Sequence, residues 1–170
     1  MPWQKLLAVD ARLSEQIRVA ERPGWLRSLA IFLAHSGDSW FWLLALALVW
    51  WLGSAEWKSK SLIFAAAIIA AAVVVFVIKL TVRRQRPAGD WGNIYRSTDP
   101  HSFPSGHATR AVLLAILAID LGPPWLALLL GVWAPLVILA RVAMGVHYVA
   151  DVIAGAALGI VLGGIFLLIL

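Results

Sequence analysis

Long apolar stretches alternate with short polar clusters along the whole chain. Four of these stretches contain no Asp, Glu, Lys or Arg: residues 39–55, 61–78, 121–140 and 152–170. A helix needs about 20 apolar residues, with a range of roughly 17–25, to cross the hydrocarbon core of a bilayer. An open strand edge cannot lie in lipid, so each such stretch is expected to be a helix. The pattern therefore predicts a helical integral membrane protein.

The same pattern predicts five spanning helices and one shorter amphipathic helix. The spanning helices are expected at about 38–53, 60–80, 105–121, 124–142 and 147–170. The amphipathic helix is expected at 3–21, where Leu6, Val9, Leu13 and Ile17 recur at spacings of three and four. Such a helix should lie in the membrane interface. The predicted fold class is an all-α, polytopic membrane helix bundle with an N-terminal interfacial helix.

Polar and turn-forming residues mark the breaks between helices. Pro23-Gly24 ends the amphipathic helix, and the turn-like sequence His-Ser-Gly-Asp interrupts the chain at 35–38. The segment GSAEWKSK, at 53–60, is expected to be a loop. The polar segment 83–104 is rich in Arg, Asp, Gly, Pro and Ser, and loops this long are usually functional or disordered.

Composition supports this assignment and narrows the chemistry. Hydrophobic residues make up 62% of the 170 residues, which is outside the range of soluble globular proteins. This length allows one domain, with the interfacial helix at 1–24 and a helical core at 25–170. The absence of cysteine excludes disulfides and thiolate catalysis. The net charge of +5 is modest and concentrated in clusters, which favours an anionic ligand or lipid headgroups over nucleic acid.

Three polar clusters, at 79–87, 104–107 and 140–151, are predicted to share one face of the membrane. The helix at 60–80 ends on this face, and the loop that follows stays there until the next helix begins. Two further crossings return the chain to the same face at Arg141 and His147. Two histidines, one aspartate and several cations would then converge at one membrane surface.

This combination of residues suits attack on a phosphate ester. Phosphoryl transfer needs cations and N–H donors around the phosphate oxygens, a nucleophile in line and an acid at the leaving oxygen. Lys79, Arg86 and Arg141 offer the cations, and Ser105-Gly106 offers free N–H groups at a helix start.

Histidines supply the proton transfers and the nucleophile. His147 and Asp151 are four residues apart and are expected on one helix face, where the carboxylate fixes the imidazole tautomer. His107, at the start of another helix, could give a proton to the leaving oxygen. Singly, a membrane-end cation is usually a snorkelling anchor and a histidine is usually structural. His35 and His101 are assigned to that structural class.

These clusters resemble the motifs of the type 2 phosphatidic acid phosphatase family, which shares its site with the vanadium haloperoxidases. The first family motif is Lys, six residues and Arg-Pro, matched by Lys79, Arg86 and Pro87. The second, Pro-Ser-Gly-His, is matched by 104–107. The third is Ser-Arg, five residues, His, three residues and Asp. The chain matches its Arg, His and Asp at 141, 147 and 151, but has Ala140 in place of the serine.

The resemblance implies a role for each matched residue. His147 would be the nucleophile through a phosphohistidine, Asp151 its orienting residue, and His107 the general acid and base. Phosphate binding would fall to Lys79, Arg86, Ser105, Gly106 and Arg141. No metal and no other cofactor is implied. The soluble, vanadate-binding haloperoxidase branch disagrees with the hydrophobicity of this chain.

The expected function is that of an integral-membrane lipid phosphatase. Phosphatidylglycerol phosphate, phosphatidic acid and undecaprenyl pyrophosphate are the candidate substrates, and the membrane is the expected partner, with no role for nucleic acid. A lipid A phosphatase is an alternative, as is a non-catalytic lipid-binding or transport protein.

The expected location is a bacterial inner membrane with the site on the extracytoplasmic face. The positive-inside rule alone places Arg83, Arg84, Arg86 and Arg96 in the cytoplasm. The family resemblance places the site outside, and it is preferred here because several of these cations are committed to phosphate.

Overall fold

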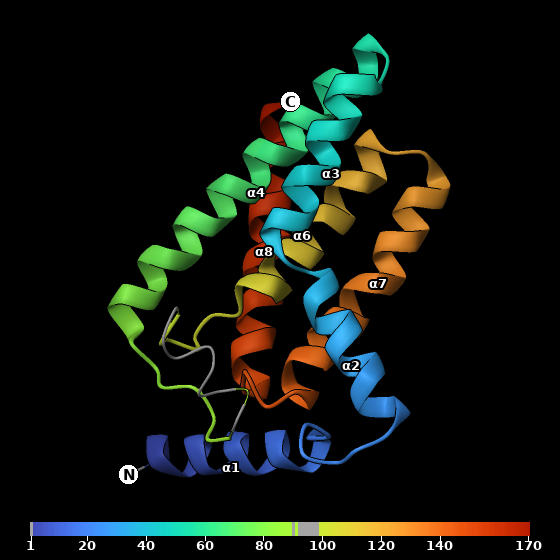
Figure 1. Ribbon diagram of the computed structural model, residues 1–170. Helices are drawn as coiled ribbons and strands as arrows, with labels where there is room; N and C mark the ends of the chain where they lie inside the picture. Colours follow the sequence, from blue (N-terminus) through green and yellow to red (C-terminus); the bar gives the residue numbers. More distant parts are fainter. Residues whose placement is uncertain (1, 90, 92–98) are drawn as a thin grey trace.

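Seven helices make up the described part of the computed structural model, which covers residues 2–89, 91 and 99–170 (Figure 1). They are α1 (Pro2–Ile17), α2 (Trp25–Ser36), α3 (Ser39–Leu52), α4 (Ala55–Val82), α6 (Gly106–Leu121), α7 (Pro124–Ala143) and α8 (Val149–Ile169). An isolated bridge between Gln85 and His101 joins the two ends of the 83–104 loop. Within the described ranges there is no β-strand, and the predicted all-α fold class is confirmed. Arg96 lies outside the described residues.

Three predicted boundaries are wrong. The amphipathic helix, expected to reach residue 21, ends at Ile17. The segment 53–60, expected to be a loop, is almost entirely the first turn and a half of α4. Ser54 caps this helix by accepting a hydrogen bond from the Trp57 N–H, and Lys60 pairs with Glu56 four residues earlier at 2.6 Å. The polar residues of this segment therefore cap and stabilise the first turns of a helix. At the third boundary, α8 begins at Val149 and leaves His147 in the preceding turn.

The helix α6 lies at the centre of the bundle, with α4, α7 and α8 around it (Figure 1). Its fully buried side chains include Leu113, Leu114 and Leu117, which pack with residues of α4 in the main core cluster. Because the other helices shield α6 from lipid, its 16 residues can include a histidine at the second position and a buried arginine one turn later.

A row of glycines lets α8 approach α6 closely. An ideal Cβ on Gly155 would lie 2.5 Å from the Ser105 carbonyl oxygen, and one on Gly159 would lie 2.5 Å from the Thr109 carbonyl oxygen. Small residues spaced four apart are a common means of bringing membrane helices together. The approach continues to the end of the bundle, where the Ser105 N–H donates to the Asp151 carbonyl at 3.0 Å. This packing therefore joins two of the predicted motifs.

The outer surface suits a lipid environment. The helices α4, α7 and α8 are long and apolar enough to cross a membrane, and α2 and α3 together form a fourth candidate, bent by 56° at residues 37–38. The remaining expected spanning helix, at 105–121, corresponds to α6. Large apolar side chains on the outside of α4 remain exposed, among them Ile69, Val73 and Phe76.

The helix α1 lies across the end of the bundle at which α8 begins (Figure 1). Its Ser14 hydroxyl accepts the Val149 N–H at 3.0 Å, and its Asp10 carboxylate accepts the Ala150 N–H at 2.9 Å. These N–H groups belong to the first turn of α8 and have no partner within the helix. Leu6, Val9 and Leu13 stay exposed on α1, as an interfacial helix requires.

Candidate active site

A cavity of about 670 Å³ opens at this end of the bundle and collects residues from all three predicted clusters. Its polar lining includes Lys79, Arg86, Gly106, His107, Arg141 and His147. Apolar side chains form another part of the wall: Trp40, Ala71, Ala72, Val75, Phe76 and Leu80. The cavity therefore offers charged groups to a headgroup and an apolar surface to a lipid chain.

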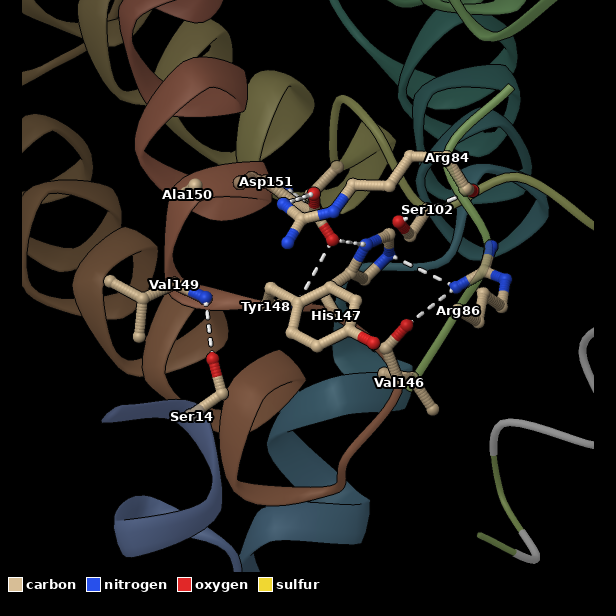
Figure 2. Close-up of polar contacts among 12 residues, drawn as sticks. Ser14, Arg84, Arg86, Ser102, Val146, His147, Tyr148, Val149, Ala150 and Asp151 are labelled. Atoms are coloured by element: carbon tan, nitrogen blue, oxygen red, sulfur yellow. Dashed lines mark hydrogen bonds and ion pairs between the residues drawn. The ribbon is translucent and has the colours of Figure 1, made fainter. Parts of the chain in front are cut away.

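His147 sits between a guanidinium and a carboxylate (Figure 2). Its Nε2 lies 3.3 Å from Nη1 of Arg86, and its Nδ1 lies 3.6 Å from Oδ2 of Asp151. The expectation that His147 and Asp151 share a helix face is wrong, because His147 precedes α8. The two side chains meet because Asp151 folds back over the helix start and accepts the Tyr148 N–H at 2.9 Å.

Asp151 is fixed by a second partner that the sequence did not indicate. Arg84 donates to its Oδ1 at 2.8 Å and also pairs with Asp10 of α1 at 2.6 Å. The Arg84 guanidinium additionally lies 4.0 Å from the centroid of the Tyr148 ring. The fully buried Asp151 carboxylate is therefore compensated by charge as well as by hydrogen bonds.

Burial lowers the pKa of His147 well below its ordinary value of 6.5, and the positive charges of Arg86, Arg141 and Lys79 lower it further. Its side chain is 1% exposed, so water cannot stabilise the imidazolium form. His147 is therefore a neutral imidazole at neutral pH. This form has the unprotonated ring nitrogen that a nucleophile needs, and Nη1 of Arg86 lies 3.3 Å from it.

Lys79 and Arg86, two of the cations predicted to bind phosphate, hold a carboxylate in this structure. Asp99, from the end of the 83–104 loop, forms an ion pair with Lys79 and accepts from Nη2 of Arg86 at 2.7 Å. Its backbone carbonyl accepts from Nε of the same arginine, also at 2.7 Å. The Asp99 side chain is 41% exposed, whereas both cations are buried. A carboxylate thus pairs with two of the cations that are predicted to bind a phosphate.

Ser105 and Gly106 occupy the start of α6 as predicted, although only Gly106 lines the cavity. The Ser105 hydroxyl is fully buried and accepts from the Ala108 N–H at 3.4 Å. Its side chain therefore caps α6, and its backbone N–H already donates to the Asp151 carbonyl at 3.0 Å. The phosphate contact expected of Ser105 stays a prediction.

His107 makes a contact that the sequence analysis missed. Its Nε2 lies 2.7 Å from Oδ1 of Asp38, in the break between α2 and α3. His35, assigned to a structural class, lies 3.2 Å from the other oxygen of the same carboxylate. His101 belongs to the cavity lining. A carboxylate in the interruption of an apolar stretch was the available signal for Asp38, but nothing in the sequence paired it with His107.

Among the described residues, no group of three or more His, Asp or Glu side chains is arranged to hold a metal ion. The negative groups at the site are each engaged by cations or imidazoles, as described for Asp38, Asp99 and Asp151. The arrangement can instead bind an anion with Lys79 and Arg86 and bring it against a neutral histidine.

Comparison with known proteins identifies the family. The family described as the PAP2 superfamily matches residues 60–170, and the chain belongs to it. This match includes every motif residue named above. It confirms the predicted family and the class of enzyme, a hydrolase acting on lipid phosphates in a membrane.

Several curated proteins are similar over most of the chain. The chain is 34% identical over 163 residues to a decaprenylphosphoryl-5-phosphoribose phosphatase of Mycobacterium tuberculosis, with 92% of this chain and 87% of the relative covered. It is 39% identical to the protein of the same name from Mycolicibacterium smegmatis, covering 88% and 78%. An undecaprenyl-diphosphatase of Sulfolobus acidocaldarius is 31% identical, covering 79% and 66%.

Two solved structures share the fold. One is a transmembrane PAP2-type phosphatidylglycerolphosphate phosphatase from Bacillus subtilis, with a TM-score of 0.79 at 24% identity, covering 97% of this chain and 86% of that one. The other is LpxE of Aquifex aeolicus, with a TM-score of 0.72 at 26% identity, covering 92% and 93%. The helix bundle is therefore the one used by membrane PAP2 phosphatases.

Proposed function

We propose that this phosphatase transfers the phosphate of its lipid substrate to His147 and then to water. The observation that carries this proposal is the position of a neutral, buried His147 between Arg86 and Asp151 in a cavity lined by cations. Lys79, Arg86 and Arg141 would hold the phosphate oxygens and stabilise the charge that spreads over them in the transition state.

The first step forms a phosphorus–nitrogen bond and breaks the bond between phosphorus and the leaving oxygen. Nε2 of His147 attacks, and His107 gives its proton to the leaving alcohol or phosphate. Asp151 accepts the hydrogen on the other ring nitrogen and stabilises the positive ring that forms. In the second step water attacks phosphorus, His107 takes the water proton, and inorganic phosphate leaves His147 with its lone pair restored.

The proposed substrate is a phosphate or diphosphate carried by a long polyprenyl lipid. The similar proteins with identities of 34% and 39% are named for a decaprenylphosphoryl sugar phosphate, and another is named for undecaprenyl diphosphate. The apolar wall of α4 beside the cations supports a substrate whose first chain segment stays in lipid. A phosphatidylglycerol phosphate substrate is the second candidate, because it was expected on sequence grounds.

A panel of lipids tests the substrate assignment. Purified enzyme is given polyprenyl diphosphate, decaprenylphosphoryl-5-phosphoribose, phosphatidylglycerol phosphate, phosphatidic acid and lipid A at equal surface concentration, and phosphate release is measured. The proposal predicts the highest kcat/KM for a polyprenyl substrate. A clear preference for a glycerolipid or for lipid A would overturn it.

The site is proposed to face the extracytoplasmic side of a bacterial inner membrane. Arg84 and Arg86 form ion pairs with the site carboxylates Asp151 and Asp99. Because these arginines have a role in the site, we do not count them in the positive-inside rule, and this supports the proposal. The chain has no cysteine, so single cysteines at Lys5, near the site, and at Lys58, at the other end, can be labelled in whole cells. A membrane-impermeant maleimide should label Lys5→Cys and spare Lys58→Cys; the reverse pattern would place the site in the cytoplasm.

A further inference from the structure

The carboxylate of Asp38 lies at the site but has no role in the mechanism proposed above. It lies between α2 and α3, outside the part of the chain that carries the three motifs, yet it contacts His107 directly at 2.7 Å. The bend of 56° between α2 and α3 brings this break of the chain into the cavity wall, where Asp38 and Ser39 line the cavity.

Helix capping does not account for Asp38. The residue occupies the N-cap position of α3, where an aspartate ordinarily accepts a backbone N–H of the first turn. Its side chain makes no such hydrogen bond. Both oxygens are instead directed at imidazoles, Oδ1 at His107 and Oδ2 at His35. A carboxylate in a membrane-spanning element is costly, so a position that forgoes the local capping bond needs another reason.

The break is held rigidly against α6. Arg110, one turn after His107, donates to the Gly37 carbonyl, with Nε at 2.8 Å, and also to the Ser39 hydroxyl. Gly37 approaches so closely that an ideal Cβ there would lie 3.1 Å from Cδ2 of His107. The residues on either side of Asp38 are thus anchored to the helix that carries His107, which fixes the distance between the carboxylate and the ring.

We propose that Asp38 is the positioning residue of His107, as Asp151 is of His147. The carboxylate accepts the Nε2–H of His107 and leaves Nδ1 to exchange the proton with the leaving oxygen and with water. It also stabilises the imidazolium form against the positive charges of Arg110 and Arg141, with His35 on its far side. This inference rests on the proposed role of His107 as general acid.

The test compares a poor and a good leaving group. Pre-steady-state bursts of alcohol release are measured with phosphatidic acid, which needs an acid, and with p-nitrophenyl phosphate, which does not. Asp38→Asn should slow the phosphatidic acid burst by about 10- to 100-fold, part of the roughly 10²–10⁴-fold that a general acid supplies, and leave the nitrophenyl burst nearly unchanged. Asp120→Asn, an exposed aspartate at the other end of α6, is the matched control and should leave both unchanged.

A burst rate constant does not depend on how much of a variant is folded, so the ratio of the two rates stays informative for a poorly expressed protein. Equal slowing of both substrates by Asp38→Asn would overturn the inference. The rate on phosphatidic acid should also begin to fall at lower pH in Asp38→Asn than in the wild type, because the imidazolium form has lost its stabilising charge. An unchanged basic limb would contradict the assignment.

The His107→Ala variant separates this inference from the proposed function. In that background Asp38→Asn should change the ratio of the two rates no further, whereas an independent additional loss would show that Asp38 acts elsewhere. If His107→Ala itself slows both substrates equally, the proposed acid role fails. His107→Ala could slow only the phosphatidic acid burst while Asp38→Asn keeps the wild-type ratio of the two burst rates. That result would refute the Asp38 inference and leave the proposed role of His107 in place.

Discussion

His147 combines nearly complete burial with a neutral imidazole ring. Burial and three neighbouring cations hold its pKa below 6.5, so the neutral form persists as the pH falls through that value. A nucleophile that is active when neutral loses activity only when protonated. The acid limb of kcat/KM should therefore lie below pH 6.5.

The measurement is a pH–rate profile between about pH 4.5 and 8, with the ionisation of the substrate phosphate, near pH 6, determined separately by phosphorus NMR. After this correction, an acid limb with its midpoint above pH 6.5 would show that His147 is protonated under working conditions.

Asp99 forms ion pairs with Lys79 and Arg86, so we expect its carboxylate to compete with the substrate phosphate for these two cations. Replacing its carboxylate by an amide in Asp99→Asn removes the competing charge and keeps the shape, so KM should fall several-fold while kcat changes less. Steady-state kinetics on a lipid phosphate check this, with Asp120→Asn as the control. A higher KM would mean that Asp99 helps to hold the cations in place and does not oppose binding.

At the level of single residues, the sequence predicted residues that the structure brings to one cavity and missed the partners that hold them. Lys79, His107 and His147 stand in fixed spacings within one stretch of chain. The partners Asp38 and Arg84 act across 69 and 67 residues of sequence, and no periodicity or local motif reports such a contact.

At the level of helices, the contact between α6 and α8 sets the geometry of the site. Gly159 is required there, because a Cβ would meet the Thr109 carbonyl at 2.5 Å. Gly159→Ala should force the helices apart, lower the free energy of unfolding by about 1–3 kcal/mol and reduce activity by displacing Asp151 from Ser105.

Gly164 is the matched control, because an added Cβ there meets nothing within 4 Å. Gly164→Ala should leave stability unchanged or slightly increased, since alanine favours helix formation. Thermal unfolding in detergent and phosphatase activity measure both effects. Equal stability and activity of Gly159→Ala and Gly164→Ala would contradict the claim that close packing of α6 and α8 requires Gly159.

The sequence predicted the apolar middle parts of the helices better than their ends. The apolar cores of α4, α7 and α8 were evident from the sequence. The start of α4 was missed because a capped, ion-paired helical turn has the same composition as a loop. The start of α8 was missed because the proximity of His147 and Asp151 suggested a helix, whereas a helix cap produces the same proximity.

At the scale of the whole molecule, hydropathy is sufficient to predict a helix bundle in a membrane, and the packing then gathers the charged groups at one end. The proposed anion site consists of Lys79, Arg86 and Arg141, so catalysis should not require a metal ion. Phosphate release should survive excess EDTA. Complete loss that magnesium restores would contradict this account.

The central claim is that His147 carries the phosphate. The direct measurement uses His107→Ala and p-nitrophenyl phosphate labelled in its phosphate group, because this substrate needs little acid help while the variant is slow to activate water. Rapid quenching under alkaline conditions should trap label on the protein in an acid-labile bond, and peptide mapping should place it at His147. The His107→Ala/His147→Ala protein should carry none. Label on any other residue, or equal labelling of the double variant, would contradict the mechanism.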